Sequence, residues 1–452
     1  MNFVKDILSS VERLLFSGGV GSALQAITKA SSSNFQPGDI DLNAVTLVSE
    51  DGQRTYDLLA QCASFEVFEN ITSPVIFGEL TILDSVGLLD SFPIIGEEYV
   101  SISFNTPRTQ GKPASYTFRV RGVVNKQVNE SNKNVTYTLL LSSNEYRRNN
   151  VRLVNKAFEK NISDIVREIL TEDLQTDKPI RIEKTSGIQK VTLTNMPPMK
   201  AIDYLRNPQW CASTEFSGSP FVFFESRDGY VFTPIFKLIA DGRKVLQASG
   251  TDKEFFFDTQ RKDNIKDVNY RTIISYNLLS RGSGDDILAG GGITNEVITF
   301  DLVSSNYKKV TYTNNLGADK QQSPGGGASQ RSSNFNREHG KTTAVRQFMF
   351  TRADKENINP ENYSTVMAAA LNATSLIANI QVYGDSELRV GDVIRCIIPS
   401  STSIDDGKSE SRLESGNYFV SALRHMVVGI ASDRPQHTIS LELLKSDFGD
   451  VK

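Results

Sequence analysis

The stretches VTYTLLLSSNEY (residues 135–146) and HTISLELLKSDF (residues 437–448) align along their whole length without a gap. In both, apolar residues alternate with mostly polar ones, as expected for half-buried strands. Two further segments precede them in the same order: residues 95–102 resemble 390–397, and residues 116–124 resemble 418–427. Tyr116 and Thr136 are 20 residues apart, as are Tyr418 and Thr438.

These matches favour an internal repeat. Any two amphipathic strands look alike, so chance similarity is the alternative, but three elements in one order with one equal spacing favour two copies of one antiparallel β unit. A small sheet hides its edges by closing into a barrel or by pairing with a neighbour. Two units per chain would give a symmetric trimer six similar modules, which can match a six-fold partner on one side and a three-fold partner on the other.

Between the two repeats, the spacing of apolar residues changes from the alternation typical of strands to a pattern that includes helices. Pro198 starts a predicted helix that Pro208 stops. Two apolar strands follow, joined by a tight turn at RDG (227–229). We therefore predict an α+β domain over residues 147–260, inserted between a first β-barrel at 41–146 and a second at 375–448.

The remaining segments receive simpler predictions. Residues 1–40 are predicted to form an amphipathic helix and a linker. Residues 261–374 are predicted to supply connecting strands, with a mobile loop over residues 313–341 because that tract is polar and rich in Gly and Ser.

Composition argues against several classes of function. The 452 residues carry 49 basic and 53 acidic side chains, a net charge of -4 that opposes a general attraction to nucleic acid. The three cysteines lie far apart in sequence, and the three histidines, two of which fall twelve residues apart in predicted strands, match no zinc motif, so we predict no metal and no cofactor. They are Cys62, Cys211, Cys396, His339, His425 and His437. Phosphate-loop and G-x-S-x-G motifs are absent, and we predict no enzyme activity.

The run NMPPMKAIDYLRNPQWCASTEFSGSPFVFFESRDGYVFTPI (195–235) contains a Pro-led helix, a Ser/Gly break and the motif F-E-x-R-D-G-Y. It resembles a signature of the baseplate hub proteins of T-even-like contractile-tailed bacteriophages. Residues 290–313 resemble the next block of that family, and GDSELRVGDVIRCIIP (384–399) with SGNYFVSALRHMVV (415–428) resembles its C-terminal barrel.

The resemblance implies a mainly β, α+β chain with two similar tail-tube-like antiparallel β-barrels and an inserted α+β domain, assembled as a ring-shaped homotrimer. It implies a non-enzymatic adaptor between the hexameric tail tube and the trimeric spike, lining the channel that the genome crosses at ejection. Implied partners are the tail tube protein, the spike protein, and baseplate wedge or tape-measure proteins, with transient, non-specific passage of DNA. The implied location is the virion tail baseplate, after synthesis in the host cytoplasm.

Three alternatives remain open at this point. The hub or spike base of a type VI secretion system or extracellular injection particle has the same duplicated design. A cell-wall hydrolase needs two carboxylates across a cleft, which a sequence does not exclude. An adhesin built from β modules would not form a regular trimer.

The basic run NEYRRNNVRLVNKAFEK (144–160) has two interpretations. As one helix it would carry a cationic stripe. The family resemblance instead suggests a helical turn near 144–150 followed by an extended RLVNKAF, which we prefer. Its charges could face water, contact a subunit or spike, or contact DNA. The candidate interface residues are Tyr146, Arg147, Arg148, Arg152, Lys156, Tyr204, Arg227 and Tyr230.

Overall fold

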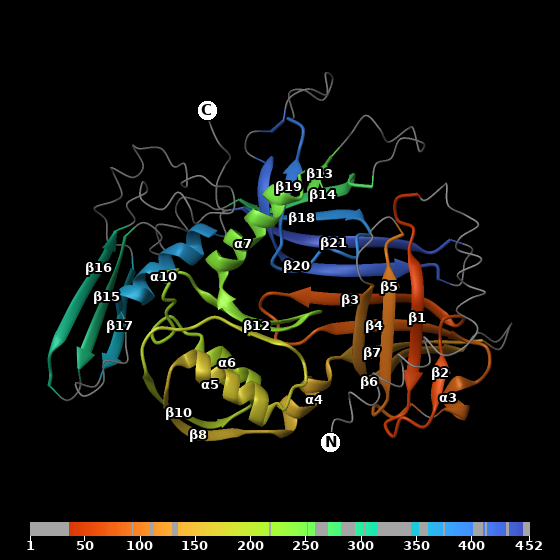
Figure 1. Cartoon of the computed structure of the whole chain (residues 1–452), viewed down its shortest axis with the longest axis horizontal. Helices are drawn as coiled ribbons and strands as arrows, with labels where there is room; N and C mark the ends of the chain where they lie inside the picture. Colours follow the sequence, from red (N-terminus) through yellow and green to blue (C-terminus); the bar gives the residue numbers. More distant parts are fainter. Residues whose placement is uncertain are drawn as a thin grey trace.

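The computed structural model is dominated by one 13-stranded sheet (Figure 1). Along its main path the strand order is β14-β18-β21-β20-β3-β4-β7-β6-β5-β1-β2. No helix in the described part of the chain is long and apolar enough to cross a membrane. The described residues are 36–92, 94–107, 113–128, 134–216, 218–250, 252–257, 270–281, 294–301, 304–313, 345–351, 360–373, 376–400, 410–411, 414–430 and 434–445.

The first β unit covers the N-terminal part of this sheet. Side chains alternate between core and surface along its strands, for example in Cys62–Asn70, because successive residues point to opposite faces. Phe65, Phe104 and Tyr137 are fully buried in its core. The elements are β1 (Asp41–Val48), β2 (Thr55–Asp57), β3 (Cys62–Asn70), β4 (Phe77–Asp84), α3 (Leu88–Ser91), β5 (Tyr99–Asn105), β6 (Ala114–Val128) and β7 (Val135–Ser142).

An α+β segment follows and has its own core beside the first unit (Figure 1). Pro198 starts a helix as predicted, because a proline at the first helical position has no N–H to leave unpaired. The elements are α4 (Asn144–Val151), β8 (Val154–Lys160), α5 (Ile162–Glu168), a π-helical turn η1 (Ile169–Asp173), β9 (Ile180–Ile182), β10 (Gln189–Met196), α6 (Pro198–Leu205), β11 (Phe221–Ser226), β12 (Gly229–Pro234) and α7 (Ile235–Ala248).

The second β unit completes the large sheet. Its strands are β13 (Glu254–Phe256), β14 (Ile273–Arg281), β18 (Leu376–Tyr383), β19 (Val393–Ile397), β20 (Gly416–Val428) and β21 (Gln436–Lys445). Between β14 and β18 the chain forms a separate three-stranded sheet and a helix, at the far left of Figure 1. These are β15 (Thr294–Asp301), β16 (Tyr307–Thr313), β17 (Val345–Thr351) and α10 (Pro360–Ala373).

Strand pairing shows the internal repeat directly. The order β3-β4-β7-β6-β5 in the first unit recurs as β14-β18-β21-β20-β19 in the second, with antiparallel pairs throughout. Register shifts fall at matching places: between Val120 and Gly122 in β6 and between Val420 and Ala422 in β20. β3 and β14 share a further shift near their starts. Because a bulge is a specific local feature, its recurrence argues against chance similarity.

Two details differ from the sequence-based expectation. Val120 lies opposite Leu141, and Val420 lies opposite the equivalent Leu443, so Val420 matches Val120 and Tyr418 matches Phe118 rather than Tyr116. The alignment of Tyr116 with Tyr418, on which the equal spacing of 20 residues rests, is therefore shifted by two residues. A shift of two keeps each side chain on the same face of the sheet, because strands have a period of two. In addition, β14 belongs to the repeated strand set although it lies in the span predicted as connecting strands, and α7 and α10 are helices that were not predicted.

The two units form one continuous sheet. Residues Ala422–Val428 of β20 pair antiparallel with Ser64–Asn70 of β3, and Val427 is packed in the first unit's core. We call this β20–β3 contact the joint. The predicted helix within residues 1–40 and the loop over 313–341 lie almost entirely outside the described residues.

Candidate assembly interface

The basic run folds as the family resemblance suggests. Asn144–Val151 forms helix α4, and Val154–Lys160 forms strand β8, which pairs with β10. The interpretation of residues 144–160 as one helix with a cationic stripe is therefore wrong. β-branched and aromatic residues at Val154 and Phe158 face the core of the α+β segment, while their neighbours face outward.

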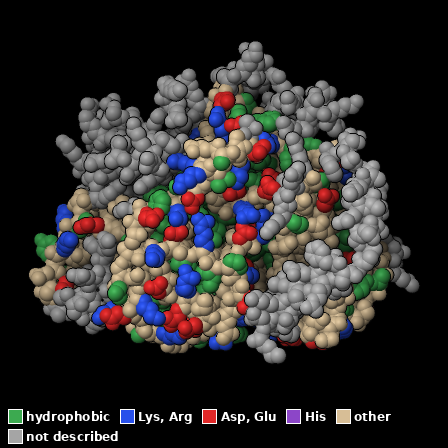
Figure 2. Space-filling model, in the orientation of Figure 1, with side chains coloured by type: hydrophobic (Ala, Val, Ile, Leu, Met, Phe, Trp, Pro, Cys, Tyr) green, Lys and Arg blue, Asp and Glu red, His purple; other side chains and the backbone are tan. Residues whose placement is uncertain are grey.

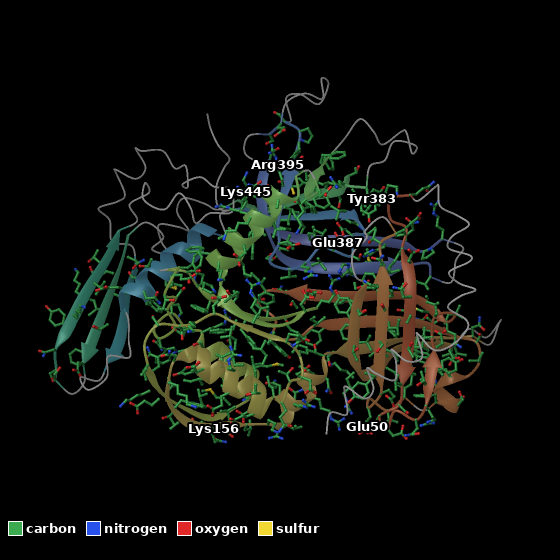
Figure 3. The ribbon with its side chains drawn as sticks, viewed as in Figure 1. Glu50, Lys156, Tyr383, Glu387, Arg395 and Lys445 are labelled. Carbon is green, nitrogen blue, oxygen red and sulfur yellow. The ribbon has the colours of Figure 1, made fainter. Side chains whose placement is uncertain are left out.

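Most cations of the run have acidic or carbonyl partners within the chain. Lys156 Nζ lies 3.0 Å from Glu172 Oε2 and 3.5 Å from Asp173 Oδ2, at the lower edge of Figure 3. Arg147 lies 3.6 Å from Glu97, and Arg148 donates to the carbonyls of Leu174 and Gln175. Figure 2 shows Lys/Arg and Asp/Glu side chains interspersed across this face. Such a mixed surface does not provide the single-sign field that phosphate binding needs.

The predicted aromatic contacts separate into two kinds. Tyr146 packs edge-on against Phe77, with the Arg121 guanidinium 5.0 Å from its ring centroid. Tyr204 is 39% exposed and stacks obliquely on Trp210, so it remains available to a partner. Tyr230, also a candidate interface residue, is only 1% exposed and packs within the chain. It lies in β12, whose residues are buried on both faces.

A buried ionic cluster fixes the α+β segment to the first β unit. Lys178 Nζ lies 2.8 Å from Glu145 Oε2 and also bonds Glu225. Glu225 in turn accepts a hydrogen bond from the backbone N–H of Ile76 at 3.0 Å and one from Ser143. Although burial opposes ionisation, Lys178 lowers the pKa of Glu145, while burial raises the pKa of Glu225. The cluster therefore links β4's start, α4 and β11 through three buried or half-buried charges.

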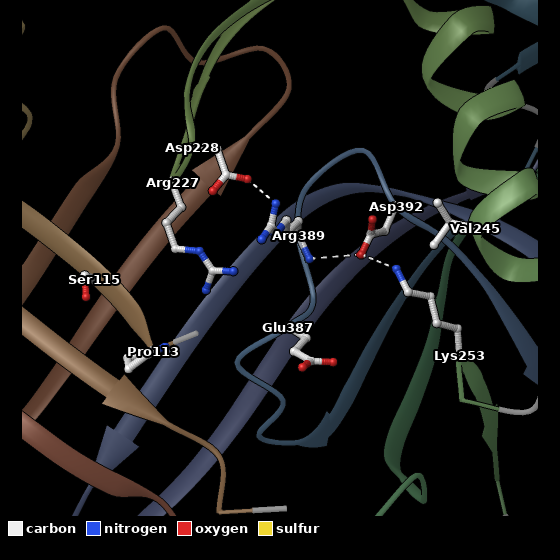
Figure 4. A pocket seen from close by; sticks show the side chains of 9 residues that line it. All are labelled: Pro113, Ser115, Arg227, Asp228, Val245, Lys253, Glu387, Arg389 and Asp392. Atoms are coloured by element: carbon white, nitrogen blue, oxygen red, sulfur yellow. Dashed lines mark hydrogen bonds and ion pairs between the residues drawn. The ribbon is translucent and has the colours of Figure 1, made fainter. Parts of the chain in front are cut away.

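A charged pocket of 620 Å³ lies where β6, the β11–β12 turn and the loop before β19 meet (Figure 4). Arg389 pairs with Asp228, and Lys253 Nζ lies 2.8 Å from Asp392 Oδ2. Arg227 donates to the Ser386 carbonyl at 2.7 Å, so this predicted interface residue holds the second unit's loop against the β11–β12 turn. The lining cations are thus largely neutralised, and the pocket presents no strong charge of one sign.

The joint encloses a second polar cluster. His425 Nδ1 and His437 Nε2 lie 3.1 Å apart, and Phe104 packs edge-on against both rings. Their other ring nitrogens have no hydrogen-bond partner in the described part of the chain. Burial lowers the pKa of His437 to about 3 and, with His437 nearby, lowers the pKa of His425 well below its usual value. Both imidazoles are therefore neutral at physiological pH.

A carboxyl group at the same joint behaves in the opposite way. Burial raises the pKa of Glu69 to about 7, although Tyr116 donates a 2.7 Å hydrogen bond to it. Among the described residues, no group of three or more His, Cys, Asp or Glu side chains is arranged to hold a metal ion. The sequence placed His425 and His437 in strands twelve residues apart, but their contact depends on the β20–β21 register, which the sequence did not supply.

Comparisons with known proteins agree with this architecture. No protein-family model matches the sequence, and no curated protein matches it. The fold is similar to that of the tail protein from Neisseria meningitidis MC58, with a TM-score of 0.52 and 10% identity over 89% of this chain and 96% of that one. It is also similar to the 43 kDa tail protein of prophage MuSo2 from Shewanella oneidensis, with a TM-score of 0.50 and 9% identity over 89% and 98% of the two chains. The chain therefore shares the β-rich fold of phage tail proteins.

Proposed function

We propose that this chain is the subunit of a trimeric baseplate hub that adapts a hexameric tail tube to a trimeric spike in a contractile-tailed phage. The observation that carries the proposal is the duplicated five-stranded unit, because it gives each chain two similar modules in one continuous sheet. Three chains would then present six modules to a six-fold tube while keeping three-fold symmetry. The fold shared with phage tail proteins supports the same conclusion.

The asymmetric parts of the chain suit the three-fold side. The α+β segment at 144–248 and the small sheet formed by β15, β16 and β17 each occur once in the described part of the chain, so a trimer would display three copies of each. We assign spike or wedge contacts to them, with Tyr204 and Arg152 as exposed candidates. The repeated sheet would surround the channel for the genome, and each repeat would take the place of one tail-tube-like barrel.

Reconstitution tests this function. The purified chain is mixed with the tail tube protein and the spike protein from the same gene cluster, and complexes are separated by size and imaged by negative stain. We expect a ring with three-fold or pseudo-six-fold symmetry between tube and spike. Failure to bind either protein would refute the hub. Portal, capsid and terminase genes nearby are expected for a phage, and their absence would instead favour a secretion or injection device.

A further inference from the structure

Strand β20 has two partners along one edge. Its first half pairs with β19, and its second half, Ala422–Val428, pairs with β3 at the joint. In the first unit, the equivalent strand β6 pairs with β5 through Arg119, but Gly122–Val128 has no partner strand on that edge in the described part of the chain. The edge of β6 at Gly122–Val128 is therefore equivalent to the edge of β20 that pairs with β3, but none of the described strands pairs with it.

The matching β3 half is also repeated. Strand β14 is the equivalent of β3, since Tyr276 lies opposite Ile380 as Phe65 lies opposite Leu80. β14 ends the sheet and pairs, among the described strands, only with β18. One chain thus has one complete joint and the two separate halves of another, at opposite ends of the repeated strands.

We propose that β6 of one chain pairs antiparallel with β14 of a second copy of the same chain, reproducing the β20–β3 joint between subunits. Such a contact joins two different surfaces, so it is head-to-tail and generates a ring when the rotation closes. Only the number of copies in the ring rests on the function proposed above. The strand pairing itself rests on the internal repeat.

The repeat also specifies the register. Val427 lies opposite Phe65 in the joint, and its equivalent Val128 is placed opposite Tyr276 of the second copy. In the same way, the opposed pair Met426 and Glu66 of the joint corresponds to Gln127 of one copy opposite Asn277 of the second copy. Register shifts next to these positions, between Val124 and Gln127 and between Leu278 and Ser280, limit the defined register to this central part.

Burial and charge fit this occupant. Val128 is 62% exposed in the chain, whereas its equivalent Val427, at the joint, is 0% exposed and packs in the first unit's core. The edge Gly122–Val128 carries one charged residue, Lys126, and the segment Ser275–Ser280 carries none. Edge strands that stay monomeric are commonly protected by charges, prolines or coverage, and these two edges have little of that protection.

Cysteine cross-linking tests the register. Gln127→Cys and Asn277→Cys are introduced together; both positions are exposed, and directly opposite residues lie within disulfide reach at about 5 Å. Mild oxidation is expected to give covalent multimers on a non-reducing gel. The matched control pairs Gln127→Cys with Ser275→Cys, two residues along the strand, where the separation of about 7–8 Å should prevent linking. The native cysteines are buried and should not interfere.

A second variant tests the contact without cysteines. Val128→Asp places a charge in the paired edge and is expected to raise the dissociation constant of the oligomer by about tenfold or more, measured by sedimentation. Ile188→Asp is the control, because Ile188 is equally exposed at 64% but lies outside both edges. The inference would be overturned if the Val128→Asp chain kept its oligomeric state and the double-cysteine chain failed to cross-link. A parent chain that stays monomeric at every concentration reached would also overturn it. A cross-linked ring that binds neither tube nor spike would refute only the proposed hub.

Discussion

Replacing His437 with Gln is expected to change how stability depends on pH. In the unfolded chain this imidazole binds a proton below its usual pKa of 6.5, whereas in the fold it stays neutral down to about pH 3. The unfolded state therefore binds more protons in this window, and the native state loses about 1.4 kcal/mol for each pH unit of acidification. Between pH 6.5 and 4.5 the loss through His437 is about 3 kcal/mol.

The Gln variant lacks this titration but keeps a polar partner for His425. It is expected to be less stable than the parent chain at pH 7, because the ring's packing against Phe104 is lost. On acidification to pH 4.5 the difference should shrink by about 3 kcal/mol. Urea denaturation followed by circular dichroism at several pH values measures both the stability difference at pH 7 and its change on acidification.

Glu69→Gln is the control with the opposite sign. The folded carboxyl binds its proton up to about pH 7, but the unfolded one only up to about 4.5, so the parent chain loses stability as the pH rises through this window. Relative to the parent, Glu69→Gln should therefore gain stability toward neutral pH. A difference between parent and His437→Gln that stays constant from pH 7 to 4.5 would refute the assignment of a neutral, buried His437.

Lys178→Met leaves two buried carboxylates without their cation and is expected to cost about 3 kcal/mol in chemical denaturation, whereas the exposed Lys244→Met should leave stability unchanged. Gly384→Ala places a Cβ 2.0 Å from His437 Nδ1, so the melting temperature should fall; it should fall less in a His437→Ala background, where the ring is gone but the Cβ of residue 437 still lies 2.7 Å away. Arg148→Ala removes the donor to two carbonyls after η1 and should cost about 1 kcal/mol in urea titration; equal stability would show that water replaces it.

The local signals predicted the repeat well. Alternating apolar residues identified β6, β7, β20 and β21, and the gap-free match between β7 and β21 agrees with the strand pairing. β14 was missed because about ninety residues, including another sheet, separate it from β18, so its partner could not be recognised from sequence order. The joint was also missed, because periodicity identifies a strand but does not identify its neighbour.

The candidate site was harder to predict than the fold. The basic run attracted attention through charge, yet its partners Glu172 and Asp173 come from a different element, so neutralisation was not visible locally. Tyr230 was chosen from a family motif, although the apolar run FVFFES in the preceding strand indicates a hairpin covered on both faces. The sequence showed only that His425 and His437 match no zinc motif, and the structure adds that they contact each other.

The joint has a consequence for assembly kinetics. Because β20 and β3 belong to the same polypeptide, their association is unimolecular and its rate does not depend on protein concentration. Six single-module subunits would need five bimolecular steps to assemble before the ring closes, whereas three of these chains would need only two. For the proposed trimeric ring, duplication within one chain therefore lowers the concentration at which the ring can close.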